Sequence, residues 1–253
     1  MSAWTPAIAF DLSSFEIPGC SPGIDPRLQG NSGKRLDENK TYIIGDIHGC
    51  DLLLEKLLKE IAWEPETERL IFLGDYIDRG PNPKRVVDLI LELSKRGNVD
   101  CLMGNHEGLF IHFLSTGDPR LSLSNGGETT FRSYGIESGI EQREQAISLV
   151  PPAHLEFYRS LRFFIELDEY LVVHAGLRPG VALEKQTPED LLWIREPFLH
   201  SHYDFGKIVV FGHTPFRQPL IMVNKIGLDT GAVYGNRLTC MELPGRALIS
   251  VGA

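Results

Sequence analysis

The stretch IFLGDYIDRG, residues 71–80, is an apolar run that reaches a glycine and is followed at once by a carboxylate. An apolar run of this kind is typical of a strand buried inside a sheet. Four other stretches repeat the pattern and place a residue that can bind a metal beside the glycine: YIIGDIHG (42–49), CLMGNHE (101–107), LVVHAG (171–176) and VVFGHT (209–214). Ligands bind beyond the carboxyl ends of strands in open α/β sheets, so we expect the five blocks to meet at one place.

The rest of the chain predicts how these strands are connected. Apolar residues at helical spacing follow the first two blocks, over 51–58 and 83–93, and this alternation predicts parallel strands with right-handed crossovers. From residue 162 onward strands dominate and are expected to form a second sheet, with one short helix at 188–194; the strands are expected at 162–167, 170–174, 208–211, 220–223, 225–228 and 238–243. The predicted fold class is therefore α/β, as a four-layer α/β/β/α sandwich.

Two segments interrupt this pattern. Residues 1–38 carry prolines, glycines and serines without clear periodicity, and we interpret them as an N-terminal extension to a domain that spans residues 39–253. Residues 115–150 have little apolar periodicity and include Asn125-Gly126-Gly127. We expect this second segment to be a cap-like insertion beside the site.

Composition limits the classes of partner. The 253 residues carry a formal net charge of −9 and no basic stripe, which argues against a nucleic-acid partner and against an anionic membrane surface. No stretch approaches the roughly 18 apolar residues that cross a bilayer, and no secretory signal is evident. The four cysteines are far apart, at positions 20, 50, 101 and 240, so a disulfide framework is not expected. These features predict a cytoplasmic, reduced protein.

Six polar residues of the five blocks are predicted to hold two divalent ions. One ion would be bound by Asp46, His48 and Asp75, and the other by Asp75 together with Asn105, His174 and His213, so that Asp75 bridges the two. Residues two apart in an extended segment point to the same side, which lets Asp46 and His48 share an ion. A nitrogen and oxygen ligand set without thiolate favours manganese, iron or zinc in an open, catalytic site.

Such a centre predicts hydrolysis of phosphate esters. Two ions roughly 3.5–4 Å apart lower the pKa of a shared water, and the resulting hydroxide attacks phosphorus directly. His106 is the predicted general acid for the leaving group, with Asp78 orienting its far nitrogen. Arg79 and Arg195 are predicted to bind the phosphate oxygens through their guanidinium forks, and Asn105 is counted with them in the phosphate site.

The same residues carry a resemblance to a known family. The blocks at 45–49, 74–80 and 104–107 resemble, in order, the three signature motifs of the PPP-type phosphoprotein phosphatases, which have the calcineurin-like metallophosphoesterase fold. The motifs at 174–176 and 212–214 resemble the later histidine motifs of that family, and the resemblance extends from about residue 41 to the carboxyl end. Residues 125–127, 193–196 and 228–234 are similar to blocks of its short bacterial and phage members.

The resemblance implies the same metal ligands, general acid and phosphate-binding arginines as the residue chemistry does. It also implies manganese as the activating metal. It implies hydrolysis of phosphoserine and phosphothreonine in proteins or peptides, with phosphotyrosine left open. The regulatory-subunit surfaces of the eukaryotic members have no counterpart in this sequence. The alternative is a diadenosine tetraphosphate hydrolase, which shares the metal core. Relatives of that kind typically lack the aspartate of the Asp-Arg-Gly block, so Asp78 favours the protein phosphatase.

Other interpretations remain for two single residues and for the function of the whole chain. Asp229 is expected to serve a turn rather than a metal, and Tyr234 could either line the floor of the site or pack in the core. A domain that only docks phosphorylated partners is the third functional class. It would have lost His106 or a metal ligand, and the sequence shows no such loss.

Overall fold

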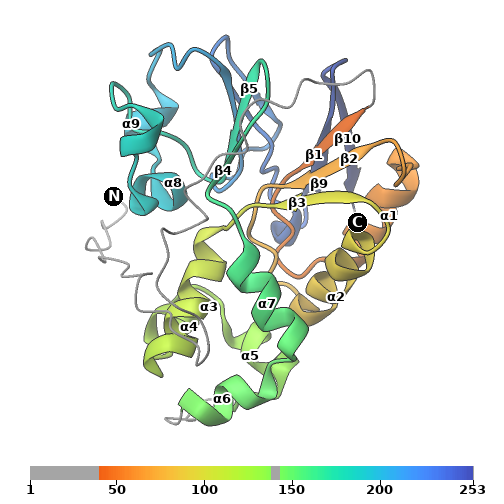
Figure 1. Cartoon of the computed structure of the whole chain (residues 1–253), viewed down its shortest axis with the longest axis vertical. Helices are drawn as coiled ribbons and strands as arrows, with labels where there is room; N and C mark the ends of the chain where they lie inside the picture. The colour runs from red at the N-terminus through yellow and green to blue at the C-terminus, as the bar shows by residue number, and fades with distance from the viewer. Residues whose placement is uncertain (1–39, 138–142, 253) are drawn as a thin grey trace.

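Two five-stranded sheets form the centre of the protein (Figure 1). The structure is a computed structural model that describes residues 40–137 and 143–252. The predicted N-terminal extension, residues 1–38, lies outside the described residues.

The first sheet has the strand order β10-β9-β1-β2-β3. Its strands β1 (Thr41–Ile44), β2 (Arg69–Phe72) and β3 (Asn98–Cys101) are parallel, as the alternation with helices predicts. The strand β9 (Arg237–Leu243) pairs antiparallel with β1, and β10 (Ala247–Gly252) pairs with β9. The expectation that every strand after residue 162 joins the second sheet is therefore wrong for β9, and β10 was not predicted.

The second sheet has the order β4-β5-β6-β8-β7. It contains β4 (Phe164–Glu166), β5 (Tyr170–Val173), β6 (Ile208–Phe211), β7 (Leu220–Ile221) and β8 (Lys225–Gly227). The strands β5, β6 and β8 run parallel, whereas β4 and β7 are antiparallel edges. Their bounds match the predicted strands to within a few residues.

A shared apolar interior joins the two sheets, and helices cover their outer faces. The interior contains Ile43, Ile71, Leu73, Leu102, Ile165, Leu167, Tyr170, Val172, Val210, Ile226, Leu228, Met241 and Leu243. Helix α1 (Asp51–Ile61) packs on β9 and β10, and α2 (Pro83–Ser94) packs on β3. Helices α8 (Pro188–Trp193) and α9 (Glu196–Leu199) lie beside the second sheet, where Phe198 contacts Phe211 (Figure 1). This arrangement confirms the four-layer α/β sandwich.

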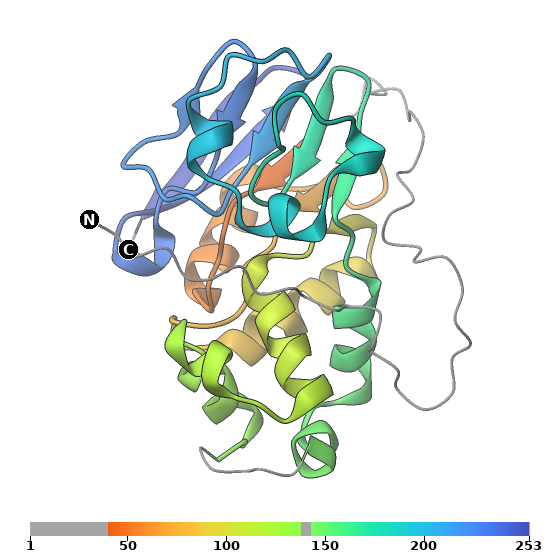
Figure 2. The ribbon, with the colours of Figure 1, turned by 90° about the vertical axis from the view of Figure 1, so that its left-hand side faces the viewer.

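A helical lobe extends from one end of the sheets (Figure 2). It comprises α3 (Asn105–Thr116), α4 (Arg120–Ser124), α5 (Glu128–Tyr134), α6 (Arg143–Leu149) and α7 (Pro152–Ser160). The predicted insertion therefore contributes α4, α5 and α6, which pack on α2 and α3. The 3-10 turns η3 (Leu183–Lys185) and η4 (Ala232–Tyr234) complete the elements of the described residues. Within the described part of the chain, no helix is long and apolar enough to span a bilayer.

Candidate metal centre and phosphate site

The structure brings the predicted ligand residues together where strands of both sheets end. The loop after β1 carries Asp46 and His48, the loop after β2 carries Asp75, and Asn105 begins α3 just beyond β3. On the second sheet, one histidine follows β5 directly and one lies two residues beyond β6. All six predicted ligands are buried: Asp46, His48, Asp75, Asn105, His174 and His213.

One half of this cluster centres on Asn105. Its Oδ1 lies 3.1 Å from His174 Nε2 and 2.9 Å from His213 Nδ1. The backbone N–H of His213 donates to Asp46 Oδ2 at 2.8 Å. The predicted ligands of the second ion therefore lie in contact, and Asp46 adjoins them.

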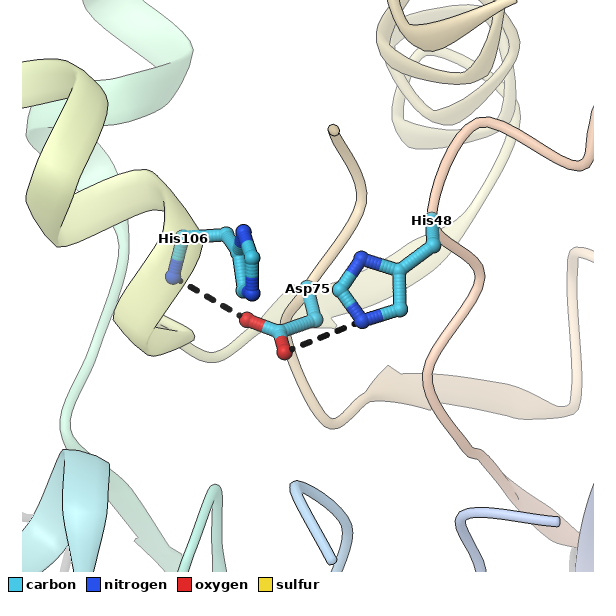
Figure 3. Close-up of side chains that lie close together, drawn as sticks. All are labelled: His48, Asp75 and His106. Atoms are coloured by element: carbon cyan, nitrogen blue, oxygen red, sulfur yellow. Dashed lines mark hydrogen bonds and ion pairs between the residues drawn. The ribbon is translucent and has the colours of Figure 1, made fainter. Parts of the chain in front are cut away.

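Asp75 connects the two halves of the cluster. Its Oδ2 lies 3.3 Å from His48 Nε2, and its Oδ1 lies 3.5 Å from His174 Nε2. In Figure 3 the carboxylate stands between His48 and His106, and the backbone N–H of His106 donates to Oδ1 at 3.2 Å. A carboxylate with one oxygen toward each half has the position that a bridging ligand requires.

Two sets of three side chains could each hold an ion. One set is His48, Asp75 and His106, and the other is Asp75, His174 and His213; the candidate ligand atoms within each lie within 4.8 Å of one another. Asp75 is common to both sets, as the bridging assignment requires. Asp46 belongs to neither set, and its Oδ2 accepts from the backbone N–H of His213.

The histidines of the cluster are in the state that metal ligation needs. Burial lowers the pKa of His48 to about 3, and it also lowers the pKa values of His174 and His213, so the three rings are neutral. The carbonyl of Ile77 faces His48 Nδ1 at 2.9 Å, and the carbonyl of Leu73 faces His174 Nδ1 at 2.8 Å. Each Nδ1 therefore carries the proton, and each Nε2 presents its lone pair to the site.

The carboxylates also fit divalent cations. Asp46 Oδ1 is buried and has no hydrogen-bond partner within the described chain. Burial, with the charges of Asp229 and Asp75, raises the pKa of Asp46 well above its ordinary value. Burial alone would raise the pKa of Asp75 as well, but the surrounding imidazoles hold it far below its usual range. A cation would supply the partner that Asp46 Oδ1 lacks, and nitrogen and oxygen donors without thiolate suit manganese, iron or zinc.

His106 and Asp78 form a buried pair beside the ligands. His106 Nδ1 lies 2.7 Å from Asp78 Oδ2, which is the geometry expected for an oriented general acid. The hydroxyl of Thr130 on α5 donates to Asp78 Oδ1 at 2.5 Å and accepts from the Asp78 backbone N–H at 2.9 Å. Thr130 was not predicted, because nothing in its local sequence marks a contact with a residue 52 positions away.

The two predicted phosphate-binding arginines lie at opposite ends of the ligand cluster. Arg79 Nη1 donates to His48 Nε2 at 2.8 Å, and Arg195 Nε donates to His213 Nε2 at 3.2 Å. Both guanidinium groups therefore reach predicted metal-ligating histidines, one in each half. The contribution of Asn105 to phosphate binding stays a prediction.

The backbone of the site is held in unusual conformations. His48, Asp75, Asp78, Arg79 and His213 have φ between 47° and 68°, in the left-handed region that side chains with a Cβ adopt at a cost. Neighbouring glycines leave space for the ligands: a Cβ on Gly104 would lie 2.2 Å from Asp75 Oδ1, and one on Gly212 would lie 2.0 Å from Asp46 Oδ1. The glycines of the motifs therefore serve close approach to the carboxylates.

Glu107 is a further residue whose role the sequence left open. Its carboxylate is fully buried and closes the capping box of α3 by accepting from Gly104 N at 2.9 Å. It also accepts the N–H groups of Asp75, Tyr76 and Ile77 at 2.9, 2.9 and 3.3 Å. Burial raises the pKa of Glu107, whereas these N–H groups favour its ionised form. One side chain thus fixes the loop that carries Asp75 to the helix that carries Asn105.

Replacing Glu107 with glutamine is expected to lower the free energy of unfolding by about 3 kcal/mol, because an amide NH₂ would face N–H donors that lose their acceptor. Denaturant unfolding measures the change. Glu128→Gln, an identical substitution at an exposed position in α5, is the control and should have little effect. Equal stabilities for the two variants would show that Glu107 does not hold the loop.

Asp229 has a larger part than the turn that was expected of it. Its Oδ1 accepts from Gly231 N at 2.9 Å, which is the turn contact. The residue is also buried close enough to the cluster for its charge to raise the pKa of Asp46, and burial raises its own pKa to about 6. Asp229 therefore adds a further carboxyl group to the electrostatics of the site.

These features define a metallophosphoesterase, and sequence comparison agrees. The chain belongs to the calcineurin-like phosphoesterase family, whose sequence profile matches residues 40–240. A relative from Geobacillus sp. (strain WCH70), bis(5'-nucleosyl)-tetraphosphatase PrpE (asymmetrical), is 30% identical over 238 residues, covering 84% of this chain and 94% of the relative. A protein of the same name from Oceanobacillus iheyensis is 27% identical, covering 85% of this chain and 92% of the relative.

Solved structures share the fold. One, provisionally described as a diadenosine tetraphosphatase, aligns with a TM-score of 0.68 at 24% identity over 89% of this chain and 96% of that chain. A cold-active protein-tyrosine phosphatase of a psychrophilic Shewanella aligns with a TM-score of 0.64 at 17% identity over 93% of this chain and 84% of that chain. At these identities the likeness supports the architecture alone.

Proposed function

We propose that this protein hydrolyses bis(5'-nucleosyl) tetraphosphates, such as diadenosine tetraphosphate, with asymmetrical cleavage of the phosphate chain. The main support is the similarity, over 84% of the chain, to a relative that carries this name. The presence of Asp78 in the Asp-Arg-Gly block favours a protein phosphatase, but that argument rests on a single residue. The relatives support the tetraphosphate hydrolase more strongly. The proposed partner is accordingly a dinucleotide rather than a phosphoprotein.

The site geometry is compatible with such a substrate. Arg79 and Arg195 contact histidines in opposite halves of the ligand cluster, so they can bind separate phosphates of one chain. Bound divalent ions, with manganese proposed and iron or zinc as alternatives, would supply Lewis-acid stabilisation of the phosphoryl oxygens and a water-derived nucleophile. The chain's own residues orient the polyphosphate, whose departing nucleotide needs no proton from His106.

A second candidate is hydrolysis of phosphoserine and phosphothreonine esters. The observation that favours it is the buried His106–Asp78 pair at 2.7 Å. An alkoxide leaving group is a strong base and needs a proton donor, whereas the nucleotide released from an anhydride is a weak base that leaves unaided. A built general acid is therefore most useful for an ester.

A substrate panel tests the proposal. The protein is stripped with chelator and reconstituted separately with Mn²⁺, Fe²⁺, Zn²⁺ and Mg²⁺. It is then assayed with diadenosine tetraphosphate and with a phosphothreonine peptide. We expect kcat/KM for the dinucleotide to exceed that for the peptide by about tenfold or more, with ATP and AMP as products. That ratio corresponds to about 1.4 kcal/mol in the activation barrier.

Controls make the outcome of the panel decisive. Asp75→Asn protein, purified in the same way, should hydrolyse both substrates far more slowly than the wild type, which excludes a contaminating phosphatase as the source of the activity. A faster reaction with the peptide would support the second candidate instead. Release of two ADP molecules would contradict asymmetrical cleavage.

A further inference from the structure

An exposed tyrosine stands at the edge of the phosphate site on a rigid turn. Tyr234 is the last residue of η4, and 63% of its surface is exposed. The turn lies between Gly231 and Gly235, with φ of 70° and 80°, and the N–H of Tyr234 donates to Gly231 O at 3.0 Å. Asn236 Nδ2 donates to Thr230 O at 2.6 Å across the same turn. The backbone is therefore fixed while the ring faces solvent, so Tyr234 does not pack in the core.

The ring of Tyr234 adjoins the phosphate-binding machinery. Its centroid lies 5.8 Å from Cζ of Arg79, within the range of a cation–π contact. The same guanidinium reaches His48 Nε2 at 2.8 Å through Nη1. One arginine side chain therefore separates the exposed ring from a candidate metal ligand.

A second contact holds Arg79 in this position. The stem of Arg79 lies against Gly126, where an added Cβ would meet Arg79 Cγ at 2.8 Å. The backbone N–H of Arg79 also donates to Gly126 O at 2.9 Å. The turn at 125–127 and the ring of Tyr234 thus both contact Arg79, and the distance between the aromatic ring and the phosphate-binding group is set by the fold.

This pairing suits a phosphate that carries a nucleobase. An exposed aromatic ring carried on a hydrogen-bonded turn offers a stacking surface to any nucleobase, while the adjoining arginine binds the phosphate attached to it. A phosphopeptide or inorganic phosphate would use the arginine and gain nothing from the ring. We propose that Tyr234 is a specificity-determining residue that stacks a nucleobase of the substrate; this inference rests on the proposed nucleotide substrate.

The test compares two inhibitors that differ only in the base. AMP and ribose 5-phosphate are measured as competitive inhibitors of the Mn²⁺-reconstituted enzyme, with whichever substrate of the panel is hydrolysed fastest. In the wild type, AMP should bind about tenfold more tightly than ribose 5-phosphate. Tyr234→Ala should abolish this preference, and Tyr234→Phe, which keeps the ring, should retain it.

The ratio of the two inhibition constants separates a loss of base stacking from general damage to the site. Ribose 5-phosphate has no base, so its inhibition constant reports on the phosphate contacts alone. Tyr203→Ala removes another exposed tyrosine, one that packs on Phe205, and should keep the preference for AMP. Equal inhibition of the wild type by both compounds would overturn the inference. So would a preference that survives in Tyr234→Ala or is lost in Tyr234→Phe. The substrate panel decides the proposed function independently, since it does not involve Tyr234.

Discussion

Replacement of Asp75 with asparagine is expected to release both divalent ions and to lower kcat/KM by about 10³-fold. The carboxylate has one oxygen 3.3 Å from His48 Nε2 and the other 3.5 Å from His174 Nε2, so it serves both sets of candidate ligands. An asparagine keeps one oxygen and presents an NH₂ group, which repels a cation, at the other position. The rate loss corresponds to the several kcal/mol of charge stabilisation that such ions provide.

Elemental analysis of the purified variant measures the ion content directly. Asp88→Asn makes the same chemical change in α2, where the carboxylate contacts His154 outside the ligand cluster, and should leave the ion content unchanged. Two ions per chain in Asp75→Asn would refute the bridging assignment, and one ion would assign Asp75 to a single metal.

Replacement of His106 with alanine is expected to have an effect that depends on the leaving group. For a phosphothreonine peptide, loss of the general acid should lower kcat by about 10²–10⁴-fold. For diadenosine tetraphosphate the loss should be much smaller, because the departing nucleotide does not need a proton. Steady-state rates for the two substrates, each in the wild type and in the variant, measure the difference.

Two comparisons support the interpretation of this result. Asp78→Asn should reproduce the pattern, since its carboxylate orients His106 Nδ1 at 2.7 Å, whereas His200→Ala, which removes an exposed histidine paired with Glu196, should not. Equal losses on both substrates would exclude a role for His106 in leaving-group protonation. If the His106→Ala variant lost metal, His106 would instead be identified as a metal ligand, which agrees with its place in one of the two candidate sets.

The fold was predictable where apolar strands alternate with helices along the chain. The parallel strands β1, β2 and β3 each precede a helix, and that local order determines their pairing. The position of β9 was not predictable in the same way. It follows the second sheet along the chain but pairs with β1, roughly two hundred residues earlier, and such a long-range choice depends on which sheet edge is free rather than on local sequence. The strand β10 escaped prediction and pairs only with β9 within the described residues.

The candidate site was predictable because its residues occur in glycine-bearing motifs at strand ends. Asp75 and Asn105 meet as expected, since the carboxyl ends of the neighbouring parallel strands β2 and β3 are adjacent, and His174 joins them from the end of β5 in the second sheet. The partition of ligands between ions stays a prediction: Asp46 accepts from the backbone N–H of His213, and this contact does not assign its carboxylate to either ion. Supporting residues such as Thr130 carry no motif, because a hydroxyl on a helix becomes significant only when the fold brings it to Asp78.

The left-handed backbone of the site has a consequence for the evolution of this protein. Five residues with predicted chemical roles adopt positive φ, at a cost of about 1 kcal/mol each, which packing elsewhere must offset. Glycine at Asp78 or Arg79 would ease the backbone but delete a side chain on which turnover is predicted to depend. Selection for thermal stability would therefore favour glycine at these positions, whereas selection for catalytic rate would retain Asp78 and Arg79. A thermophilic lineage would have to gain its stability in the sheets and helices instead.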